Sequence, residues 1–275
     1  MRKILHMSDL HFGCIDQALL APLHALVQEL RPDLIAVSGD LTQRARSREF
    51  EAARDFLASL PAPKVVVPGN HDIPLYNVSH RFVRPLARYA SYLGDVLEAA
   101  YVDAEMVVAG VNTARSLAFK GGRISHEQVA RVRALFCGAS DQVTKIIVTH
   151  HPFDLPEGYH ARNLVGRSQM ALSELRECPP DLLLSGHLHL HRISSTSTRY
   201  DLGGKSAIVV QAGTVISTRG RGETNSFNLV RIQRPEIVIE RFDWASERRA
   251  FETASKSTFS RRGGDWVCSD QKTFI

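Results

Sequence analysis

A short buried strand that ends in polar residues constrains the fold of this chain most. Residues 64–67, Lys-Val-Val-Val, form an apolar run rich in β-branched side chains, and the Pro-Gly pair that follows ends it as a turn would. Asn70, His71 and Asp72 then stand at the carboxyl end of the predicted strand. In an α/β sheet this edge is where ligands bind, although Gly, Asn and Asp are also common turn formers. Taken alone, the stretch leaves both a ligand site and a simple turn open.

The same arrangement recurs along the chain: a short apolar strand, then side chains able to hold a metal ion. Asp9 and His11 follow a predicted strand over 4–7, and Asp40 follows one over 34–37. Likewise, His150 follows a strand over 144–149, and His187 and His189 follow one over 181–184. A parallel sheet with right-handed crossover connections places such strand ends side by side. Residues two apart in an extended chain point to the same side, so each Asp-x-His or His-x-His pair can face one site.

Three further histidines receive no metal-binding role. The proline after the paired histidines 150 and 151 fixes both at the strand end, and we assign only His150 as a ligand. His6 lies within the first strand, where a buried, hydrogen-bonded histidine is the commoner case. His191 continues the last alternating pair, but a surface or core position is favoured for it.

Helical periodicity separates the predicted strands and gives an α/β fold class. Helices are predicted over 16–30, 47–60, 79–93, 125–136 and 168–178, and the third of these can start afresh near Pro85. Further strands are predicted over 106–111, 207–211, 226–232 and 236–242. The later strands are expected to be antiparallel, with polar turns. Residues 1–242 form the predicted catalytic domain. Residues 243–275 are expected to be a C-terminal extension that packs on it or acts as a lid or dimer arm.

The amino-acid composition limits the class of protein to which this chain can belong. A chain of 275 residues with 44% hydrophobic and 23% charged residues is typical of a globular enzyme. Its first residues lack the pattern of a signal peptide, and no apolar run approaches the length that spans a bilayer. We therefore expect a cytoplasmic protein without a membrane partner. The cysteines at 14, 137, 178 and 268 form no C-x-x-C pair, so we expect them to be reduced and mostly buried.

The formal net charge of +5 is compatible with an anionic substrate, and nucleic acid must be considered. The basic residues are spread along the chain, however, and no lysine-rich arm or aromatic platform for bases is recognisable. Nucleic acid is therefore a disfavoured partner. Arg44, Arg46 and Arg48 could contact a phosphate, but exposed arginine is common at the start of a helix, so no role is assigned to them.

Taken in order, the blocks Asp-x-His, Gly-Asp, Gly-Asn-His-Asp, His and Gly-His-x-His resemble those of the calcineurin-like metallophosphoesterase superfamily. The resemblance covers residues 4–189. It implies a four-layer αββα sandwich of two mixed β-sheets flanked by helices, with a dinuclear metal centre. The combination of Gly-Asn-His-Asp with Thr-His-His-Pro and Gly-His-Leu-His is similar to the bacterial class III cyclic-nucleotide phosphodiesterases and the glycerophosphodiesterases.

The resemblance also implies roles for individual residues. One metal ion would be held by Asp9, His11, Asp40 and His189, and the other by Asp40, Asn70, His150 and His187, with Asp40 as the bridge. His71 would be a catalytic residue beside the centre, as a proton donor or phosphate contact, and Asp72 would support it. Asn70 and His71 would bind the substrate.

The chemistry of these ligands agrees with the resemblance. Carboxylate, imidazole and amide ligands suit Mn, Fe, Co or Zn better than Mg or Ca, and the absence of thiolate argues against a purely structural zinc site. Two divalent cations held by two carboxylates leave a charge of about +2, which attracts a phosphate group. Such a pair can lower the pKa of a bound water for in-line attack on phosphorus.

The sequence thus predicts a metal-dependent phosphodiesterase that acts on small phosphodiesters such as 3′,5′- or 2′,3′-cyclic nucleotides. A promiscuous glycerophosphodiesterase or phosphomonoesterase and a nuclease remain alternatives, and a lipid-precursor pyrophosphatase or a non-enzymatic scaffold is less favoured. The segments 112–123 and 153–167, which could border the substrate, carry no readable signature. A homodimer or higher homo-oligomer is left open.

Overall fold

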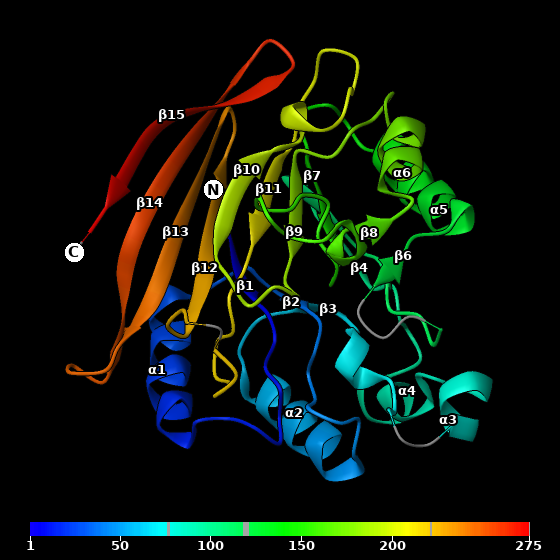
Figure 1. Ribbon diagram of the computed structural model, residues 1–275. Helices are drawn as coiled ribbons and strands as arrows, with labels where there is room; N and C mark the ends of the chain where they lie inside the picture. The colour runs from blue at the N-terminus through cyan, green and yellow to red at the C-terminus, as the bar shows by residue number, and fades with distance from the viewer. Residues whose placement is uncertain (76–77, 118–120, 221, 275) are drawn as a thin grey trace.

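Strand β1 (Arg2–Met7) shows how the layers of the fold arise. Its side chains alternate between two buried faces, so Leu5 and Met7 enter one apolar cluster while Ile4 enters another. A strand that is buried on both faces must lie between two layers of structure. The computed structural model, which describes residues 1–75, 78–117, 121–220 and 222–274, shows these layers (Figure 1).

The first large sheet has seven strands. Its order is β15 (Asp265–Thr273), β14 (Ala250–Arg262), β13 (Glu236–Ala245), β12 (Ser226–Gln233), β1, β2 (Leu34–Ser38) and β3 (Lys64–Val67). Strands β1, β2 and β3 run parallel, whereas β12 and the strands beyond it are antiparallel. The carboxyl ends of β1, β2 and β3 therefore meet at one edge.

The second large sheet has six strands. Its order is β10 (Arg192–Ser195), β11 (Ile208–Gln211), β9 (Leu182–Ser185), β7 (Thr144–Val148), β5 (Met106–Gly110) and β4 (Ala100–Val102). The four central strands are parallel, and β10 and β4 close the edges antiparallel. A third sheet of two strands pairs β6 (Gly122–Arg123) with β8 (Val165–Gly166) and joins two long loops.

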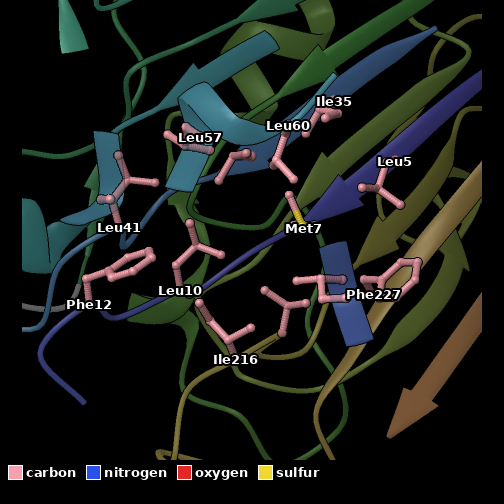
Figure 2. Packing of buried hydrophobic residues seen from close by; sticks show 14 of the residues in the cluster. Leu5, Met7, Leu10, Phe12, Ile35, Leu41, Leu57, Leu60, Ile216 and Phe227 are labelled. Atoms are coloured by element: carbon pink, nitrogen blue, oxygen red, sulfur yellow. The ribbon is translucent and has the colours of Figure 1, made fainter. Parts of the chain in front are cut away.

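Helices cover the outer faces of both large sheets (Figure 1). Side chains of α1 (Leu20–Leu30), α2 (Ser47–Ser59) and α4 (Ala87–Leu93) pack against the seven-stranded sheet, and Figure 2 shows part of this cluster. Helices α5 (His126–Cys137) and α6 (Ser168–Glu174) cover the six-stranded sheet. A third cluster fills the space between the sheets. The predicted four-layer αββα sandwich is confirmed.

The local structure differs from the sequence prediction in a few places. The helical segment predicted over 79–93 consists of two helices, α3 (Val78–Val83) and α4, with the new start near Pro85 that the sequence suggests. The helix predicted over 168–178 ends at Glu174. Short 3-10 turns occur as η1 (Gln17–Leu19), η2 (Asn70–Asp72), η3 (Ala161–Asn163) and η4 (Thr196–Thr198).

Residues 243–274 continue the seven-stranded sheet. The predicted division after residue 242 falls inside β13, and β14 and β15 add to the same sheet as a long antiparallel hairpin. Trp266 of this hairpin is buried, and its Nε1 donates to Asp181 Oδ1 at 3.0 Å. This bond ties the hairpin to the start of β9 in the other sheet. The domain division and the role as a lid or dimer arm stay predictions.

The expectation of reduced cysteines is wrong for two of the four, and the expectation that most are buried is wrong as well, because only Cys178 is buried. Cys137 and Cys178 form a disulfide with a Cα–Cα distance of 5.2 Å. They are 41 residues apart in the sequence, but Cys137 ends α5 and Cys178 follows α6, and these helices pack side by side. Cys14 is half-buried and Cys268 is exposed, both as free thiols.

Two histidines without an assigned metal role make stability depend on pH. His6 Nε2 donates to Ser38 Oγ at 3.0 Å, and burial is the main cause that lowers its pKa from 6.5 to about 3. Burial, with the charge of Arg241, lowers the pKa of His191 to about 4. Below pH 6.5 the unfolded chain therefore binds protons that the folded chain does not. The free energy of unfolding is expected to fall between pH 6.5 and about 4.

Each of these histidines contributes a slope of about 1.4 kcal/mol per pH unit. Urea unfolding of the protein in chelator, at several pH values, measures it. His6→Gln, whose amide can occupy the place of Nε2, is expected to reduce the slope by about one proton, and His160→Gln at an exposed position is the control. Equal slopes for His6→Gln and the unsubstituted chain would contradict this account.

Candidate metal centre

The loops after β1, β2, β3, β7 and β9 converge at the carboxyl edges of the two sheets. Nine non-glycine residues in the described part of the chain have positive φ, and five of them are predicted ligands: Asp9, His11, Asp40, His187 and His189. Such a conformation costs about 1–3 kcal/mol per residue and persists only where the surroundings impose it. The chain thus holds strained backbone at the positions that the sequence singled out.

Two glycines allow these loops to approach one another closely. A Cβ on Gly69 would lie 2.1 Å from Asp40 Oδ1, and a Cβ on Gly186 would lie 1.7 Å from Ser8 Oγ. Neither gap can hold a side chain, because real Cβ contacts do not fall below 3.0 Å. The glycines of Gly-Asn-His-Asp and Gly-His-Leu-His are therefore required by the packing of ligand-bearing loops.

The first group of donor atoms comes from Asp9, His11, Asp40 and His189, which are all buried and lie within 4.8 Å of one another. His189 Nε2 lies 3.2 Å from Asp9 Oδ1 and 3.2 Å from His11 Nε2. His11 Nε2 lies 3.6 Å from Asp9 Oδ1 and 3.8 Å from Asp40 Oδ2. Donors that each lie about 2.0–2.2 Å from one ion are roughly 3.0–3.6 Å apart. Three of the four distances fall in this range and the fourth, 3.8 Å, is slightly longer, so the group is close to the dimensions of a metal site.

The second group comes from Asn70, His150, His187 and again Asp40. Asn70 Oδ1 lies 3.1 Å from His150 Nε2 and 3.1 Å from His187 Nδ1. His150 Nε2 lies 3.4 Å from Asp40 Oδ2. Asp40 Oδ2 therefore belongs to both groups, while Oδ1 of the same carboxylate accepts from the His71 backbone N–H at 2.8 Å.

Hydrogen bonds to the backbone orient two of the imidazoles so that their other ring nitrogen faces the two groups of donor atoms. Nδ1 of His150 donates to the Ser38 carbonyl at 2.8 Å, and Nδ1 of His189 donates to the Arg219 carbonyl at 3.0 Å. A backbone acceptor on one ring nitrogen fixes the tautomer and leaves the other nitrogen to bind metal. The Nε2 atoms of His189 and His11 lie 3.2 Å apart, so both can bind one cation.

Asp9 gives an independent test of whether a cation fits. Its Oδ2 accepts from Ser8 Oγ at 2.6 Å and from the His187 backbone N–H at 3.0 Å. Its Oδ1 is buried and has no hydrogen-bond partner among the described residues. An unpaired buried carboxylate oxygen is costly, and here it faces two imidazole nitrogens. The residues present fit a bound metal ion.

The electrostatics of these side chains agree with this view. Burial would raise the pKa of Asp40, but His150 and His71 outweigh it and hold that pKa well below its ordinary value. Burial likewise opposes the charged form of His150, yet Asp40 and its hydrogen bond raise the pKa of His150 to about 9. A cation that binds here must displace that proton, so its affinity is expected to rise with pH.

Asp72 lies where the sequence places it but makes other contacts. We expected its carboxylate to support the imidazole of His71. Instead it accepts from the backbone N–H groups of Leu41, Thr42 and Gly69 at 3.2, 2.9 and 2.8 Å, and from Thr42 Oγ1 at 2.9 Å. The reason is that η2 turns the carboxylate toward the loop after β2. Asp72 therefore fastens two ligand-bearing loops together, and burial, with the charge of Asp40, raises its pKa to about 6.

The imidazole of His71 is oriented by two residues that the sequence analysis missed. Nδ1 donates to the Gln43 carbonyl at 2.9 Å, and Nε2 accepts from Arg219 Nη1 at 3.1 Å. Burial is the main cause that lowers the pKa of His71. Arg219 lies after β11 with no motif around it, and its one sequence signal is positive charge.

His151, which the sequence analysis set aside, is buried beside the second group. Its Nδ1 is 2.8 Å from Thr113 Oγ1, and its ring centroid is 4.6 Å from that of His187. With His150 and His187 it forms a further group of possible donors. Burial is the main cause that holds the pKa of His151 well below its ordinary value, so the ring is neutral.

A cleft of about 380 Å³ opens onto the centre. It is lined by the predicted ligands Asp40, Asn70, His187 and His189, by His71, and by Gln43, Arg44, Ile73, Leu75, Arg81, Arg162, Asn163 and Arg219. Its volume lies within the range of small-molecule sites.

Among the described helices, none is long and apolar enough to cross a bilayer.

Two solved structures share this fold. A dimetal phosphatase from Danio rerio has a TM-score of 0.64 and 14% identity, over 92% of this chain and 98% of that protein. The purple acid phosphatase PPD1 from yellow lupin has a TM-score of 0.65 and 13% identity, over 94% of this chain and 54% of that protein. At such identities the similarity shows the fold alone.

Two curated relatives are more similar in sequence. The glycerophosphodiester phosphodiesterase GpdQ of Enterobacter lignolyticus is 27% identical over 165 residues, which cover 55% of this chain and 58% of GpdQ. The 3′,5′-cyclic adenosine monophosphate phosphodiesterase CpdA of Escherichia coli K12 is 27% identical over 206 residues, 68% of this chain and 69% of CpdA. The match thus spans less than two thirds of GpdQ.

These similarities support the expectation of a phosphoric ester hydrolase. Residues 2–191 match the model of the calcineurin-like phosphoesterases, a range that includes every predicted metal ligand. The chain belongs to the calcineurin-like phosphoesterase family.

Proposed function

We propose that this chain is a phosphodiesterase that depends on two metal ions and hydrolyses small phosphodiesters such as 3′,5′- or 2′,3′-cyclic nucleotides. In this proposal Asp9, His11, Asp40 and His189 hold one divalent cation, and Asp40, Asn70, His150 and His187 hold the other. Mn, Fe, Zn and Co are the proposed metals, because the donors are oxygen and nitrogen without thiolate.

The observation that carries the proposal is the position of Asp40. Its Oδ2 is within 3.8 Å of His11 Nε2 and within 3.4 Å of His150 Nε2, so a single oxygen faces both groups of donors. A carboxylate placed in this way can bridge two cations at the spacing of about 3.5–4 Å that two-metal hydrolases use.

When bound, the metal pair supplies a water of lowered pKa and positive charge beside the phosphoryl oxygens. His71 and Arg219, which line the same cleft, would hold the substrate. Arg219 Nη1 donates to Gln43 Oε1 and His71 Nε2, so the other N–H groups of the guanidinium would donate to a phosphoryl oxygen. Because Nε2 of His71 accepts from Arg219, it would first have to leave this contact and take up a proton from solvent; the imidazolium could then pass that proton to the leaving oxygen.

The relatives favour diesters as the substrate class. CpdA is described as acting on a cyclic nucleotide and GpdQ on glycerophosphodiesters, and both are similar to this chain at 27% identity. A glycerophosphodiesterase that also cleaves monoesters is therefore the second candidate. A nuclease is disfavoured, because no Phe, Tyr or Trp is among the described residues that line the cleft. The cytoplasmic location and a homo-oligomeric state stay expectations.

The first test compares bis(p-nitrophenyl) phosphate with p-nitrophenyl phosphate. The protein is stripped with a chelator, dialysed, and reconstituted with Mn²⁺ or Zn²⁺. Diester hydrolysis is expected to disappear on chelation and return with metal, with the diester favoured in kcat/KM. Preference for the monoester would make the chain a phosphatase. No turnover of either ester with metal bound would contradict the proposal.

A further inference from the structure

Three buried imidazoles lie against one another beside the second group of donor atoms. His150 and His151 follow β7, and His187 follows β9. The ring centroid of His151 is 4.9 Å from that of His150 and 4.6 Å from that of His187, and the centroids of His150 and His187 are 5.1 Å apart. One ring nitrogen of each residue lies within 4.8 Å of the other two. His150 and His187 are proposed ligands of the second cation, whereas His151 has no role so far.

The ring of His151 is held in place by residues from the loop after β5. Its Nδ1 lies 2.8 Å from Oγ1 of the buried Thr113, and the same hydroxyl accepts from the His151 backbone N–H at 3.4 Å. Gly122 also lies against the ring, because a Cβ at this position would be 2.2 Å from Nδ1. The position of His151 is thus set by contacts to Nδ1 and to the backbone.

The other ring nitrogen of His151 is left over. Nε2 is buried and has no hydrogen-bond partner among the described residues. Buried polar atoms are nearly always paired, so this nitrogen requires an explanation. When Nδ1 donates to Thr113 Oγ1, Nε2 carries the lone pair, which is the form of imidazole that binds a metal ion.

The neighbours of His151 show which metal ion its nitrogen could reach. Asn70 Oδ1 lies 3.1 Å from His150 Nε2 and 3.1 Å from His187 Nδ1, so both of these histidines face the second cation. His151 packs against both rings. A nitrogen that lies within 4.8 Å of a nitrogen of each is near the separation of opposite donors on one ion, which is about 4.4 Å for bonds of 2.0–2.2 Å.

His151 also approaches from the side that leaves the centre accessible. Asp40, Asn70 and His187 line the cleft, whereas His150 and His151 lie behind the lining and are 0% exposed. A catalytic metal ion keeps a position open for water or substrate. A donor from behind the cleft does not take that position.

From this arrangement we infer that His151 is a further ligand of the second cation, through Nε2. The inference rests on the two-metal centre of the proposed function and enlarges its ligand set. The second position then offers three imidazoles, the Asn70 amide and the shared Asp40, whereas the first offers two imidazoles and the carboxylates of Asp9 and Asp40. Imidazole suits Zn²⁺ and carboxylate suits Mn²⁺, so the second position is expected to favour Zn²⁺ more strongly than the first does.

The test is proton NMR of the protein after treatment with a chelator and loading with two equivalents of Co²⁺. An imidazole that binds Co²⁺ through one nitrogen gives a strongly shifted, exchangeable signal from the N–H of its other nitrogen. The unsubstituted protein is expected to show one such signal more than its four other histidine ligands account for, and these are His11, His150, His187 and His189. His151→Gln is expected to lose that signal alone.

Two further variants control for effects on the surroundings. His126→Gln removes an exposed histidine on α5 and is expected to keep every shifted signal. Thr113→Val removes the acceptor of Nδ1–H but no metal ligand, so the extra signal should persist and exchange faster with water. Absence of the extra signal from the unsubstituted protein overturns the inference, and this count does not require that His151→Gln folds. A His151→Gln protein that keeps every signal overturns it as well.

Calorimetric titration of the chelator-treated protein with Zn²⁺ and with Mn²⁺ gives a second readout. In His151→Gln, one of the two Zn²⁺ binding steps is expected to weaken by at least about 10- to 100-fold, the loss that removal of a ligand's supporting partner already causes, while the other step is unchanged. The loss for Mn²⁺ is expected to be smaller. Unchanged Zn²⁺ binding in both steps contradicts the inference.

These readouts are independent of turnover, so the inference and the proposed function can fail separately. A protein that shows the extra Co²⁺-shifted signal but hydrolyses neither p-nitrophenyl ester supports His151 as a ligand and contradicts the proposed function. A protein that hydrolyses the diester but lacks the signal supports the proposed function and contradicts this role of His151.

Discussion

Replacing Asp40 with alanine is expected to remove metal-dependent hydrolysis of bis(p-nitrophenyl) phosphate, with a loss of at least about 10²-fold in kcat/KM. Partners that merely orient metal ligands already contribute about 10- to 100-fold, and Asp40 is a shared donor of both groups. Its removal also leaves the His71 backbone N–H without its acceptor, which lies at 2.8 Å. Metal content by atomic emission should fall below two ions per chain in the same variant.

Asp40→Asn separates the loss of metal from damage to the fold. The amide keeps the size of the side chain and an oxygen for the His71 N–H, but it removes the charge that bridges two cations. Circular dichroism of this variant should match that of the unsubstituted chain while metal content falls. Asp55→Ala, at an exposed site on α2, is the control for removal of a carboxylate. Two metal ions per chain in Asp40→Ala would show that the bridge is misassigned.

His71→Ala is expected to keep the metal content and lower kcat by about 10²–10⁴-fold, the usual contribution of a general acid. His71 lies beside the centre, with its ring centroid 4.9 Å from that of His11, but its ring nitrogens contact Gln43 and Arg219 rather than the donor groups. Steady-state kinetics and metal analysis of one preparation measure both quantities.

An exposed histidine provides the matched control for this variant. His126→Ala, on the outer side of α5, should leave kcat unchanged. A substrate with a good leaving group, such as p-nitrophenolate, needs less protonation than an alkoxide does. The loss in His71→Ala should therefore be smaller for p-nitrophenyl esters than for cyclic nucleotides. Loss of metal from His71→Ala would show that the residue is a ligand instead.

The sequence was sufficient to predict the donor residues of the two groups, but not the neighbours Arg219 and His151. Short β-branched runs set the strands, and the strands of an α/β sheet end at a common edge, so Asp9, Asp40 and Asn70 had to lie near one another. The four-layer fold followed from the resemblance and is confirmed by alternating buried faces such as those of Leu5 and Ile4.

Contacts that depend on the direction of a side chain could not be predicted in this way. Asp72 follows His71 directly, but the turn of η2 sends its carboxylate to Thr42, and the partners of His71 lie 28 and 148 residues away. The pairing of Cys137 with Cys178 depends in the same way on how α5 packs against α6. Sequence spacing carries no information on such distant contacts.

The two-stranded sheet of β6 and β8 limits how the substrate specificity of the cleft can be redesigned. Arg162 and Asn163 immediately precede β8, and β8 pairs with β6 from the loop after β5. A Cβ on Gly122 of β6 would lie 2.2 Å from the His151 ring. A loop graft that replaces one partner alone would break the pairing and disturb His151. The two loops therefore have to be exchanged as one cassette.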